Sequence, residues 1–370
     1  MSQSKSLRAR RRVFAAVSAT GLAFACVAAL SSPSSGSTTS GSGAARSAAA
    51  SVPFSSFEQS VAASYPRPKH GKFHLAYLDP AAGNEFLNIL GRAMGLETKR
   101  LGGTFTQLSD VGGSVNTQVT EFNQLIAQKV NGIAVFALDP KSLAPDVARA
   151  RKAGIHLITI DLSFANAPAS ALGGYESQVL QRRDQAAYST ATYMAKHLAA
   201  GSSLGTIDFI VKVPSIVFSI QRDVFWATKY GLKIAGNASN PSDDIAGGEK
   251  AGTTLINHFA GIKGVMAYND PSAIGAYTAA RSAGVSGLIF GGENGGSDGL
   301  AAVKAGTETF SLKLDAPGMG KAWAWGLYDL LQGVKVPGSV KAGAPVLVTK
   351  ANVNSVVSWE KQLKNQYPGS

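Results

Sequence analysis

The sequence predicts an α/β protein built from two doubly wound lobes, each formed around a mainly parallel sheet. Three observations lead to this prediction. The chain has 370 residues, which is long for a single domain. Its composition is 45% hydrophobic and 16% charged, which suits a protein with a large core rather than a disordered chain. From about residue 72 onward, short apolar runs alternate with amphipathic stretches, a pattern typical of parallel sheets covered by helices on both faces.

The first series of elements follows from the spacing of apolar residues. Residues 73–78 and 132–137 are nearly unbroken apolar runs, which are typical of buried strands. Val115, Val119 and Phe122 are separated by four and three residues, so they form one face of a helix. The expected order is strand 73–78, helix 86–94, helix 115–126, strand 132–137, helix 143–150 and strand 156–161.

A second series of strands and helices begins near residue 177. Its expected elements are a long helix over 177–199, a strand over 206–211, a helix over 219–234, and strands over 264–268, 288–290 and 309–314. Around ten such units exceed one comfortable sheet, so we expect two lobes.

Cysteine and histidine usage excludes several kinds of site. The one cysteine rules out an intramolecular disulfide framework and a Cys-rich zinc or iron–sulfur centre. The five histidines form no H-x-x-H or H-E-x-x-H pair, which argues against a zinc hydrolase. We therefore expect neither a metal nor a cofactor.

The net charge of +12 is unevenly distributed. Residues 1–50 hold six basic residues and no acidic one, and the rest of the chain holds 29 basic and 23 acidic residues. The remaining surplus is spread along the chain without a basic run or interleaved aromatic residues. Because a nucleic-acid surface concentrates its basic residues, we do not expect nucleic acid as a partner.

The first 30 residues have the pattern of an export signal, in which a basic stretch precedes an apolar, Ala-rich run. Arg11 and Arg12 resemble a twin-arginine signal, and the choice between this route and the general secretory route stays open. Cys26 follows A-F-A, which resembles a degenerate lipobox, so lipid attachment at Cys26 and signal cleavage elsewhere are two open alternatives. Residues 31–65 are rich in Ser, Gly and Ala and predict a flexible tether. The folded part is expected outside the cytoplasm, in the periplasm or at the cell surface.

Polar side chains follow the predicted strands, at the edge where a doubly wound sheet binds its ligand. For any single one of them, capping of the next helix is an equal alternative. The recurrence of the pattern favours convergence on one cleft. The residues are Asp79, Asp139, Asp161, Asn269–Asp270, Glu293–Asn294 and Asp315.

Four stretches carry a resemblance to a known family. Residues 130–161 contain VNGIAVFALDP and AGIHLITID, residues 264–275 are GVMAYNDPSAIG, residues 291–320 contain GGENG, VKAG and PGMG, and residues 346–352 are VLVTKAN. These motifs resemble the type I periplasmic binding proteins, and within them the ribose-like sugar-binding branch of ABC transporter substrate-binding proteins. The resemblance covers about residues 70–355 in order.

The resemblance implies a three-segment hinge, with chain crossings near residues 174, 315 and 345 and a ligand cleft between the lobes. It assigns 66–174 and 316–345 to lobe I, and 175–315 and 346–370 to lobe II.

In lobe I the resemblance implies four ligand-binding residues. Asn84 and Phe86 match the family's N-x-F at the start of the first helix, and Phe86 would form an aromatic wall or, equally, a core residue. Phe136 stands where ribose binders often have Asn, which makes this lobe more apolar. Asp161 matches the pocket Asp, whereas Leu162 replaces the Arg that often follows it.

In lobe II the resemblance implies five ligand-binding residues. Arg222 matches the pocket Arg, with a surface helix position as its alternative, and Trp226 would be a stacking ring or a core residue. Asn269 matches the pocket Asn. Asn294 stands at a position usually held by Asp and Asp315 at one usually held by Gln, so ribose itself is doubtful.

The sequence thus predicts an extracytoplasmic solute-binding protein of an ABC importer. It would bind a small polar ligand, a monosaccharide or a polyol, and act as a monomer with a membrane permease as its partner. A sensory output through a signalling receptor and a non-sugar ligand such as a nucleoside are the alternatives. No enzyme is expected, because no nucleophile, P-loop or metal motif is present, and Asp243–Asp244 lies in a turn where solvation is expected.

Overall fold

Twelve strands of the described residues form two six-stranded sheets. The computed structural model describes residues 72–109, 112–163 and 167–369. The predicted export signal, the tether and Cys26 lie outside this part of the chain. All described residues belong to one compact unit, Ala50–Ser370.

The first sheet forms lobe I and has the order β11-β5-β4-β3-β1-β2, with every pair parallel. Helices α2 and α10 pack against each other on one face, and α3 and α4 cover the other face. The elements of this lobe are β1 (His74–Asp79), α2 (Glu85–Arg100), β2 (Thr104–Ser109), α3 (Val115–Ala127), β3 (Gly132–Val135), α4 (Pro140–Lys152), β4 (His156–Ile160), the 3-10 turn η1 (Ala169–Ala171), β5 (Ser177–Leu180), α10 (Ala316–Leu331), β11 (Ser339–Lys341) and α11 (Trp359–Gln366).

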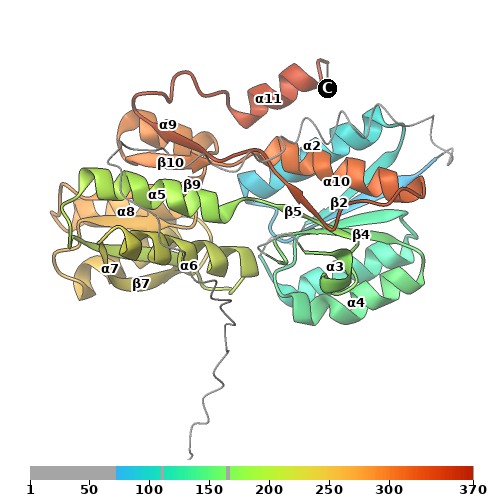
Figure 1. The fold of residues 1–370 in the computed structure, drawn as a ribbon, viewed down its shortest axis with the longest axis horizontal. Helices are drawn as coiled ribbons and strands as arrows, with labels where there is room; N and C mark the ends of the chain where they lie inside the picture. Colours follow the sequence, from blue (N-terminus) through green and yellow to red (C-terminus); the bar gives the residue numbers. More distant parts are fainter. Residues whose placement is uncertain (1–71, 110–111, 164–166, 370) are drawn as a thin grey trace, which may run out of the picture. The chain divides into compact units, whose positions relative to one another are not determined.

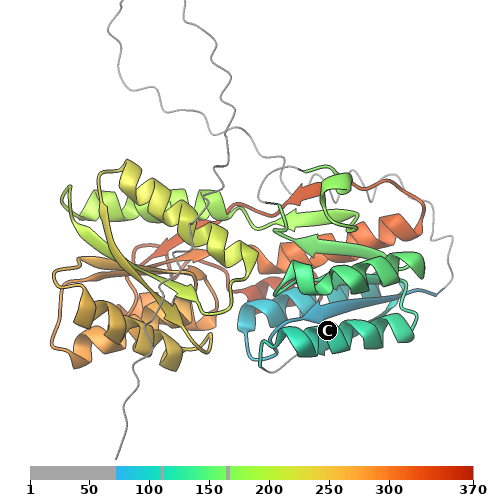
Figure 2. The same ribbon diagram turned by 90° about the horizontal axis from the view of Figure 1, so that it is seen from below.

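The second sheet forms lobe II and has the order β12-β10-β9-β8-β6-β7. Its β12 is antiparallel to β10 and the other pairs are parallel. Seen from below, each sheet lies between helices (Figure 2). The elements are α5 (Arg183–His197), β6 (Ser203–Phe209), α6 (Pro214–Lys229), β7 (Lys233–Asn240), α7 (Ile245–His258), β8 (Gly264–Ala267), α8 (Asp270–Ser282), β9 (Ile289–Asn294), α9 (Ser297–Ala305), β10 (Phe310–Lys313) and β12 (Val346–Thr349). The predicted fold class of two doubly wound lobes is therefore confirmed.

Two predicted elements differ from the structure. The stretch 177–199, predicted as one helix, contains β5 followed by α5. The predicted helix 219–234 begins earlier, at Pro214, ends at Lys229, and gives way to β7. In both places a strand adjoins a helix without a clear break in the sequence pattern, so the local spacing hides the boundary.

The crossings between the lobes also differ from the expected boundaries. Because β5 pairs with β4 in the first sheet, the first crossing comes after Leu180 rather than near residue 174. Helix α11, expected in lobe II, packs against α2 and α10 of lobe I (Figure 1). Trp359 of α11 packs against Phe86 with ring centroids 5.8 Å apart, and its Nε1 donates to the Leu314 carbonyl at 2.9 Å. The burial of this indole explains why the chain returns to lobe I after β12.

Helix caps account for several polar residues at strand ends. The side chains of Asp139, Asn269 and Asp315 each accept a hydrogen bond from a backbone N–H in the first turn of the following helix. Such caps satisfy donors that have no partner within the helix. The capping alternative is thus correct for these three residues, and Asn269 remains available to a cleft as well.

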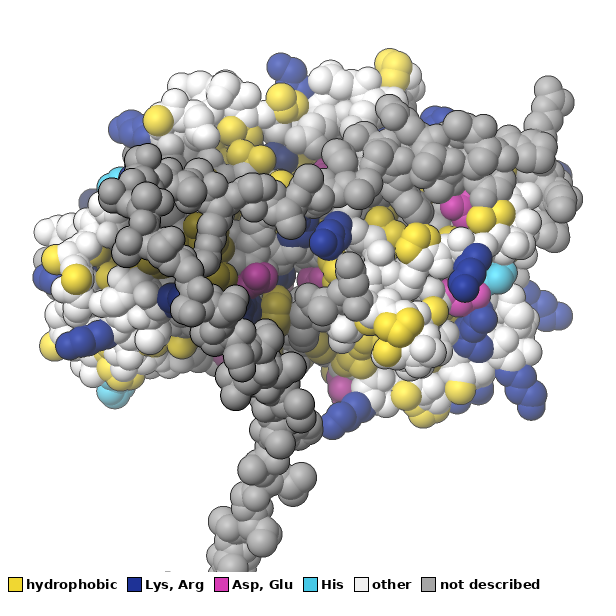
Figure 3. Space-filling model, in the orientation of Figure 1, with side chains coloured by type: hydrophobic (Ala, Val, Ile, Leu, Met, Phe, Trp, Pro, Cys, Tyr) yellow, Lys and Arg dark blue, Asp and Glu magenta, His cyan; other side chains and the backbone are white. Residues whose placement is uncertain are grey.

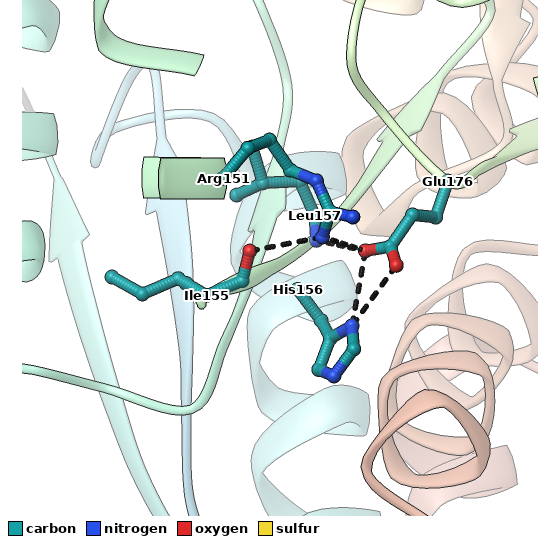
Figure 4. Close-up of polar contacts among 5 residues, drawn as sticks. All are labelled: Arg151, Ile155, His156, Leu157 and Glu176. Carbon is teal, nitrogen blue, oxygen red and sulfur yellow. Dashed lines mark hydrogen bonds and ion pairs between the residues drawn. The ribbon is translucent and has the colours of Figure 1, made fainter. Parts of the chain in front are cut away.

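A polar cluster lies at the amino ends of β4 and β5, the edge of the first sheet opposite the carboxyl ends of its strands (Figure 4). Glu176 accepts from Nδ1 of His156 at 3.0 Å and from the Leu157 N–H at 3.0 Å, and it pairs with Arg151. Arg151 also donates to the Ile155 carbonyl. The cluster fixes the junction of α4 with β4 and β5, away from the carboxyl ends of the strands.

The surface and the helices show two further features. On the face in Figure 3, Lys and Arg side chains are scattered over both lobes rather than gathered into one patch. No helix within the described residues combines the length and the apolar character needed to cross a membrane.

Candidate functional site

A cavity of about 520 Å³ lies between the carboxyl ends of the two sheets. Its walls come from both lobes and combine aromatic and aliphatic side chains with amides and carboxylates. The apolar part includes Phe86, Leu87, Phe136, Leu138, Phe209, Val211, Val213 and Ile216, and the polar part includes Asn84, Arg183, Asp243, Asp244, Asn269 and Asn294.

Backbone strain is concentrated at this cleft. Among the described residues, five non-glycine residues have a positive φ. Four of them lie at the cleft edge of the sheets, where Asp161, Arg182 and Asp243 follow strands and Asn294 is the last residue of β9. Their φ values are 43°, 63°, 58° and 109° in that order. Because such conformations are costly for residues with a Cβ, their clustering marks this edge as a functional region.

Asp243 is the centre of a hydrogen-bond network that joins the two lobes. Its Oδ1 accepts from the Tyr268 hydroxyl at 2.5 Å and from Asn269 Nδ2 at 2.7 Å. Its Oδ2 accepts from Nδ2 of Asn84, in lobe I, at 2.8 Å. Burial raises the pKa of the Asp243 carboxyl, and the three hydrogen bonds partly offset this effect. The expected solvation of Asp243 is therefore wrong, because the turn directs it into the cavity.

Arg183 provides the cationic group among the residues that line this cavity. It is 5% exposed and forms an ion pair with Glu293, which also accepts from the Ser219 hydroxyl at 2.9 Å. The Arg183 Nε has no hydrogen-bond partner among the described residues. Burial, followed by the negative charge of Glu293, raises the pKa of the neighbouring Asp223 well above its usual range.

Asp161 lies beside this cavity rather than in its wall. It lines two smaller cavities that adjoin the large one through Phe136, Val213 and Arg183. Its Oδ1 accepts from the Gln181 N–H at 2.9 Å, whereas its Oδ2 is buried without a partner among the described residues. Burial raises the pKa of Asp161 to about 6. An unsatisfied buried oxygen of this kind is suited to accept a hydroxyl hydrogen bond.

The structure brings five of the nine sequence-predicted site residues into the wall of one cavity. These are Asn84, Phe86, Phe136, Asn269 and Asn294. Four of them end β9 or follow β1, β3 and β8, as the strand-end argument requires, and Phe86 lies in the first turn of α2.

Apart from Asp161, which lies beside the cavity, the remaining three predicted residues lie elsewhere. Arg222 pairs with Asp184 and stacks over the Phe225 ring at 4.2 Å, outside the cavity-lining residues. Trp226 donates from Nε1 to Asp184 at 3.0 Å in the same aromatic cluster. Asp315 caps α10 and accepts from the Gly343 N–H at 3.1 Å, so it braces two hinge segments.

Arg183 and Asp243 are cavity residues that the sequence argument missed. Arg183 was hidden inside the predicted helix 177–199, although it begins α5 just after the carboxyl end of β5 and so obeys the strand-end rule. Asp243 follows β7, a strand that was not predicted. Locating these two strands would have identified both residues.

No group of three or more His, Cys, Asp or Glu within the described residues is arranged to hold a metal ion. The cavity instead offers hydrogen-bond donors and acceptors beside aromatic faces, a combination typical of a binding site for a small organic molecule.

Comparison with known proteins gives the family. The sequence pattern described as "Periplasmic binding protein domain" matches residues 75–335, so the chain belongs to the periplasmic binding protein family. Membership in this family implies a place of action outside the cytoplasm.

Two relatives and one solved structure are the reference points within the family. A D-ribose/D-allose-binding protein of Pseudomonas aeruginosa is 27% identical over 203 residues, covering 51% of this chain and 58% of that protein. The ribose import binding protein RbsB of Bacillus subtilis is 24% identical over 260 residues, covering 70% of this chain and 82% of that protein. A solute-binding protein of Burkholderia graminis, solved with D-arabinose, superposes with a TM-score of 0.70 at 20% identity, covering 78% of this chain and 100% of that chain. The match therefore spans little more than half the length of the Pseudomonas relative.

Proposed function

We propose that this protein captures an uncharged polyhydroxylated ligand, a monosaccharide or a polyol, in the cavity between its lobes. The main support for this proposal is the composition of the cavity. The rings of Phe86, Phe136 and Phe209 line it together with the amides of Asn84, Asn269 and Asn294. A sugar presents apolar C–H faces to aromatic rings and hydroxyls to groups that both donate and accept. The sugar-binding names of the two relatives support the same ligand class.

The charges of the cavity favour a neutral ligand. Arg183 is already paired with Glu293, and Asp243 already accepts three hydrogen bonds. A carboxylate or phosphate group would need an unpaired cation, and a buried charge without a partner is costly. The free Nε of Arg183 can donate to a hydroxyl without a change in net charge.

The two-lobe construction supports a role in transport. A ligand bonded to both lobes favours the closed arrangement through its differential contacts, and a membrane permease would recognise that arrangement. We propose an ABC permease as the partner. Delivery to a signalling receptor is the alternative output, and it uses the same binding step.

A nucleoside is the second candidate ligand. The observation that favours it is the aliphatic side of the cavity, where Leu138, Val211 and Ile216 offer more apolar surface than a pentose needs. A thermal-shift panel of pentoses, hexoses, polyols and nucleosides separates the two candidates. A ligand at a hundred times its Kd stabilises the folded chain by about 2.7 kcal/mol, which gives a readily measured shift. Stabilisation by nucleosides alone would reject the sugar proposal.

A matched pair of substitutions tests the site. Arg183→Lys keeps the positive charge but removes the planar fork and Nε, so we expect the affinity for the stabilising sugar to fall at least about tenfold, or 1.4 kcal/mol. Arg222→Lys makes the same change outside the cavity and should leave the affinity within about twofold. Isothermal titration measures both, and circular dichroism confirms that each variant is folded. Loss of binding in Arg222→Lys with normal binding in Arg183→Lys would instead support the family-based assignment.

A further inference from the structure

Glu85 joins the two lobes through a contact that involves no residue of the large cavity. It is the first residue of α2 in lobe I and lines a neighbouring cavity of about 400 Å³. Its Oε2 accepts from both the N–H and the hydroxyl of Ser297, the first residue of α9 in lobe II, each at 2.8 Å.

The contact supplies a side-chain cap that the N-cap residue of α9 cannot supply. Gly296 occupies the N-cap position of α9 and has no side chain, and the Asp270 carboxylate of lobe II accepts from the Gly295 N–H, which precedes the helix, at 2.8 Å. The Glu85 carboxylate takes that place across the cleft. It lies at the N-termini of both α2 and α9, where the helix dipoles favour a negative charge.

The local backbone is shaped for this approach. A Cβ added at Gly296 would lie 2.6 Å from Glu85 Oε2 and 3.3 Å from the Trp359 ring. A side chain at this position would displace the carboxylate from the helix end. The preceding residue, Asn84, makes the other cross-lobe bond described above, to Asp243, so consecutive side chains of lobe I hold lobe II.

We propose that Glu85 is a positioning residue, a latch that stabilises the closed arrangement of the lobes without contact with the ligand. The proposal rests on the proposed function insofar as closure retains a ligand. When the lobes separate, α9 loses its cap, so the latch shifts the equilibrium toward the closed arrangement. Its loss should therefore accelerate ligand dissociation and leave association nearly unchanged.

Two substitutions remove the latch from opposite sides. Glu85→Ala deletes the carboxylate. Ser297→Pro deletes both donors, and it suits the first position of a helix because Gly296 is already extended, with φ of −70° and ψ of −173°. Glu360→Ala is the control, because Glu360 is an exposed first-turn glutamate whose partner, Arg92, lies in the same lobe.

The first measurement needs no ligand. Spin labels on cysteines introduced at the exposed Lys141 and Lys250, in a chain with Cys26→Ser, report the distance between the lobes by pulsed EPR. We expect Glu85→Ala and Ser297→Pro to shift the distribution to longer distances, the double variant to add nothing, and Glu360→Ala to match the parent. An unchanged distribution in both latch variants overturns the proposal.

The second measurement uses D-ribose, D-allose and D-arabinose as probes. For whichever sugar the parent binds, we expect each latch variant to bind about fivefold more weakly through a faster dissociation rate, the effect of losing one helix cap. A fivefold loss that appears in the association rate instead would contradict the latch. If the parent binds none of the three sugars, these three are rejected as ligands of the proposed function, while the distance measurement still decides the latch.

Discussion

Asn294 shows how one residue can combine strain with a position in the site. It lines the cavity at the end of β9 with a φ of 109°, a value that side chains with a Cβ rarely adopt. We predict that Asn294→Gly leaves the ligand-free chain at least as stable as the parent, because relief of roughly 1–2 kcal/mol of strain offsets the added flexibility of glycine. Urea denaturation of the ligand-free protein measures this.

Asn294→Ala is the matched control for this prediction. Both variants lose the amide, so both should bind the ligand more weakly, but only alanine retains the strained backbone. Asn294→Gly should therefore denature at a higher urea concentration than Asn294→Ala. The reverse order would mean that the positive φ at Asn294 stores no strain.

At the same scale, a position at a strand end is easier to predict than a position on a helix face. Asn269 and Asn294 line the cavity because a residue at the end of a parallel strand must lie at the cleft edge, whatever its neighbours are. The prediction for Arg222 depended instead on which face of α6 the residue occupies. The inward face of α6 carries Ser215, Ser219 and Asp223, spaced by four residues. A one-residue offset turns a side chain by about 100°, which places Arg222 beside Asp184 instead.

Among the elements, α7 and α8 pack through glycines so closely that backbone meets backbone. A Cβ added at Gly275 would lie 2.3 Å from both the Glu249 nitrogen and the Ile245 carbonyl oxygen. We predict that Gly275→Ala destabilises the protein by about 1–3 kcal/mol, the usual cost of overpacking. Helix propensity alone predicts the opposite sign, since alanine is favoured over glycine inside a helix.

The denaturation midpoint decides between these two effects. Gly83→Ala serves as the control, because a Cβ added there meets no atom within 4 Å. It should change the free energy of unfolding by no more than about 0.5 kcal/mol. A stabilised Gly275→Ala would show that the two helices can move apart at little cost.

Element boundaries were the weak part of the sequence argument for a related reason. Strand β5 has four residues, Ser177–Leu180, and two of them are polar, so it carries little apolar signal of its own. Strand β5 is buried because it pairs with β4, which precedes it, and with β11, which lies far later in the chain. Pairing partners of this kind are a tertiary property, and local spacing cannot reveal them.

For the whole molecule, the sequence motifs were enough to predict the architecture, because alternating strands and helices with right-handed connections can form only a few folds. The motifs did not predict the path of the C-terminal segment. The return of α11 to lobe I depends on a pocket for Trp359 built by Phe86, Leu314 and Lys313. These residues lie far from residue 359 in the sequence, so the sequence around Trp359 does not indicate the pocket.

Buried carboxyls give the whole protein an unusual dependence on pH. Burial raises the pKa of Asp270 to about 7 and that of Asp161 to about 6, against 3.8 for either group when exposed. Between about pH 4 and 7 the folded chain therefore holds protons that the unfolded chain has released. The free energy of unfolding must fall as the pH rises through this window. His74 acts weakly in the other direction, because burial lowers its pKa.

We predict that the free energy of unfolding is lower at pH 8 than at pH 5, with Asp270 alone contributing on the order of 2–3 kcal/mol. Urea denaturation at both pH values measures the difference. Asp270→Asn is the matched variant, since an amide cannot titrate, and it should remove the Asp270 share of the pH dependence. Groups whose pKa is lowered on folding, such as Glu97 and Glu176, lose their contribution only below about pH 4.5 and so lie outside this window. A free energy of unfolding that rises from pH 5 to pH 8, or an unchanged pH dependence in Asp270→Asn, would contradict the raised pKa of Asp270.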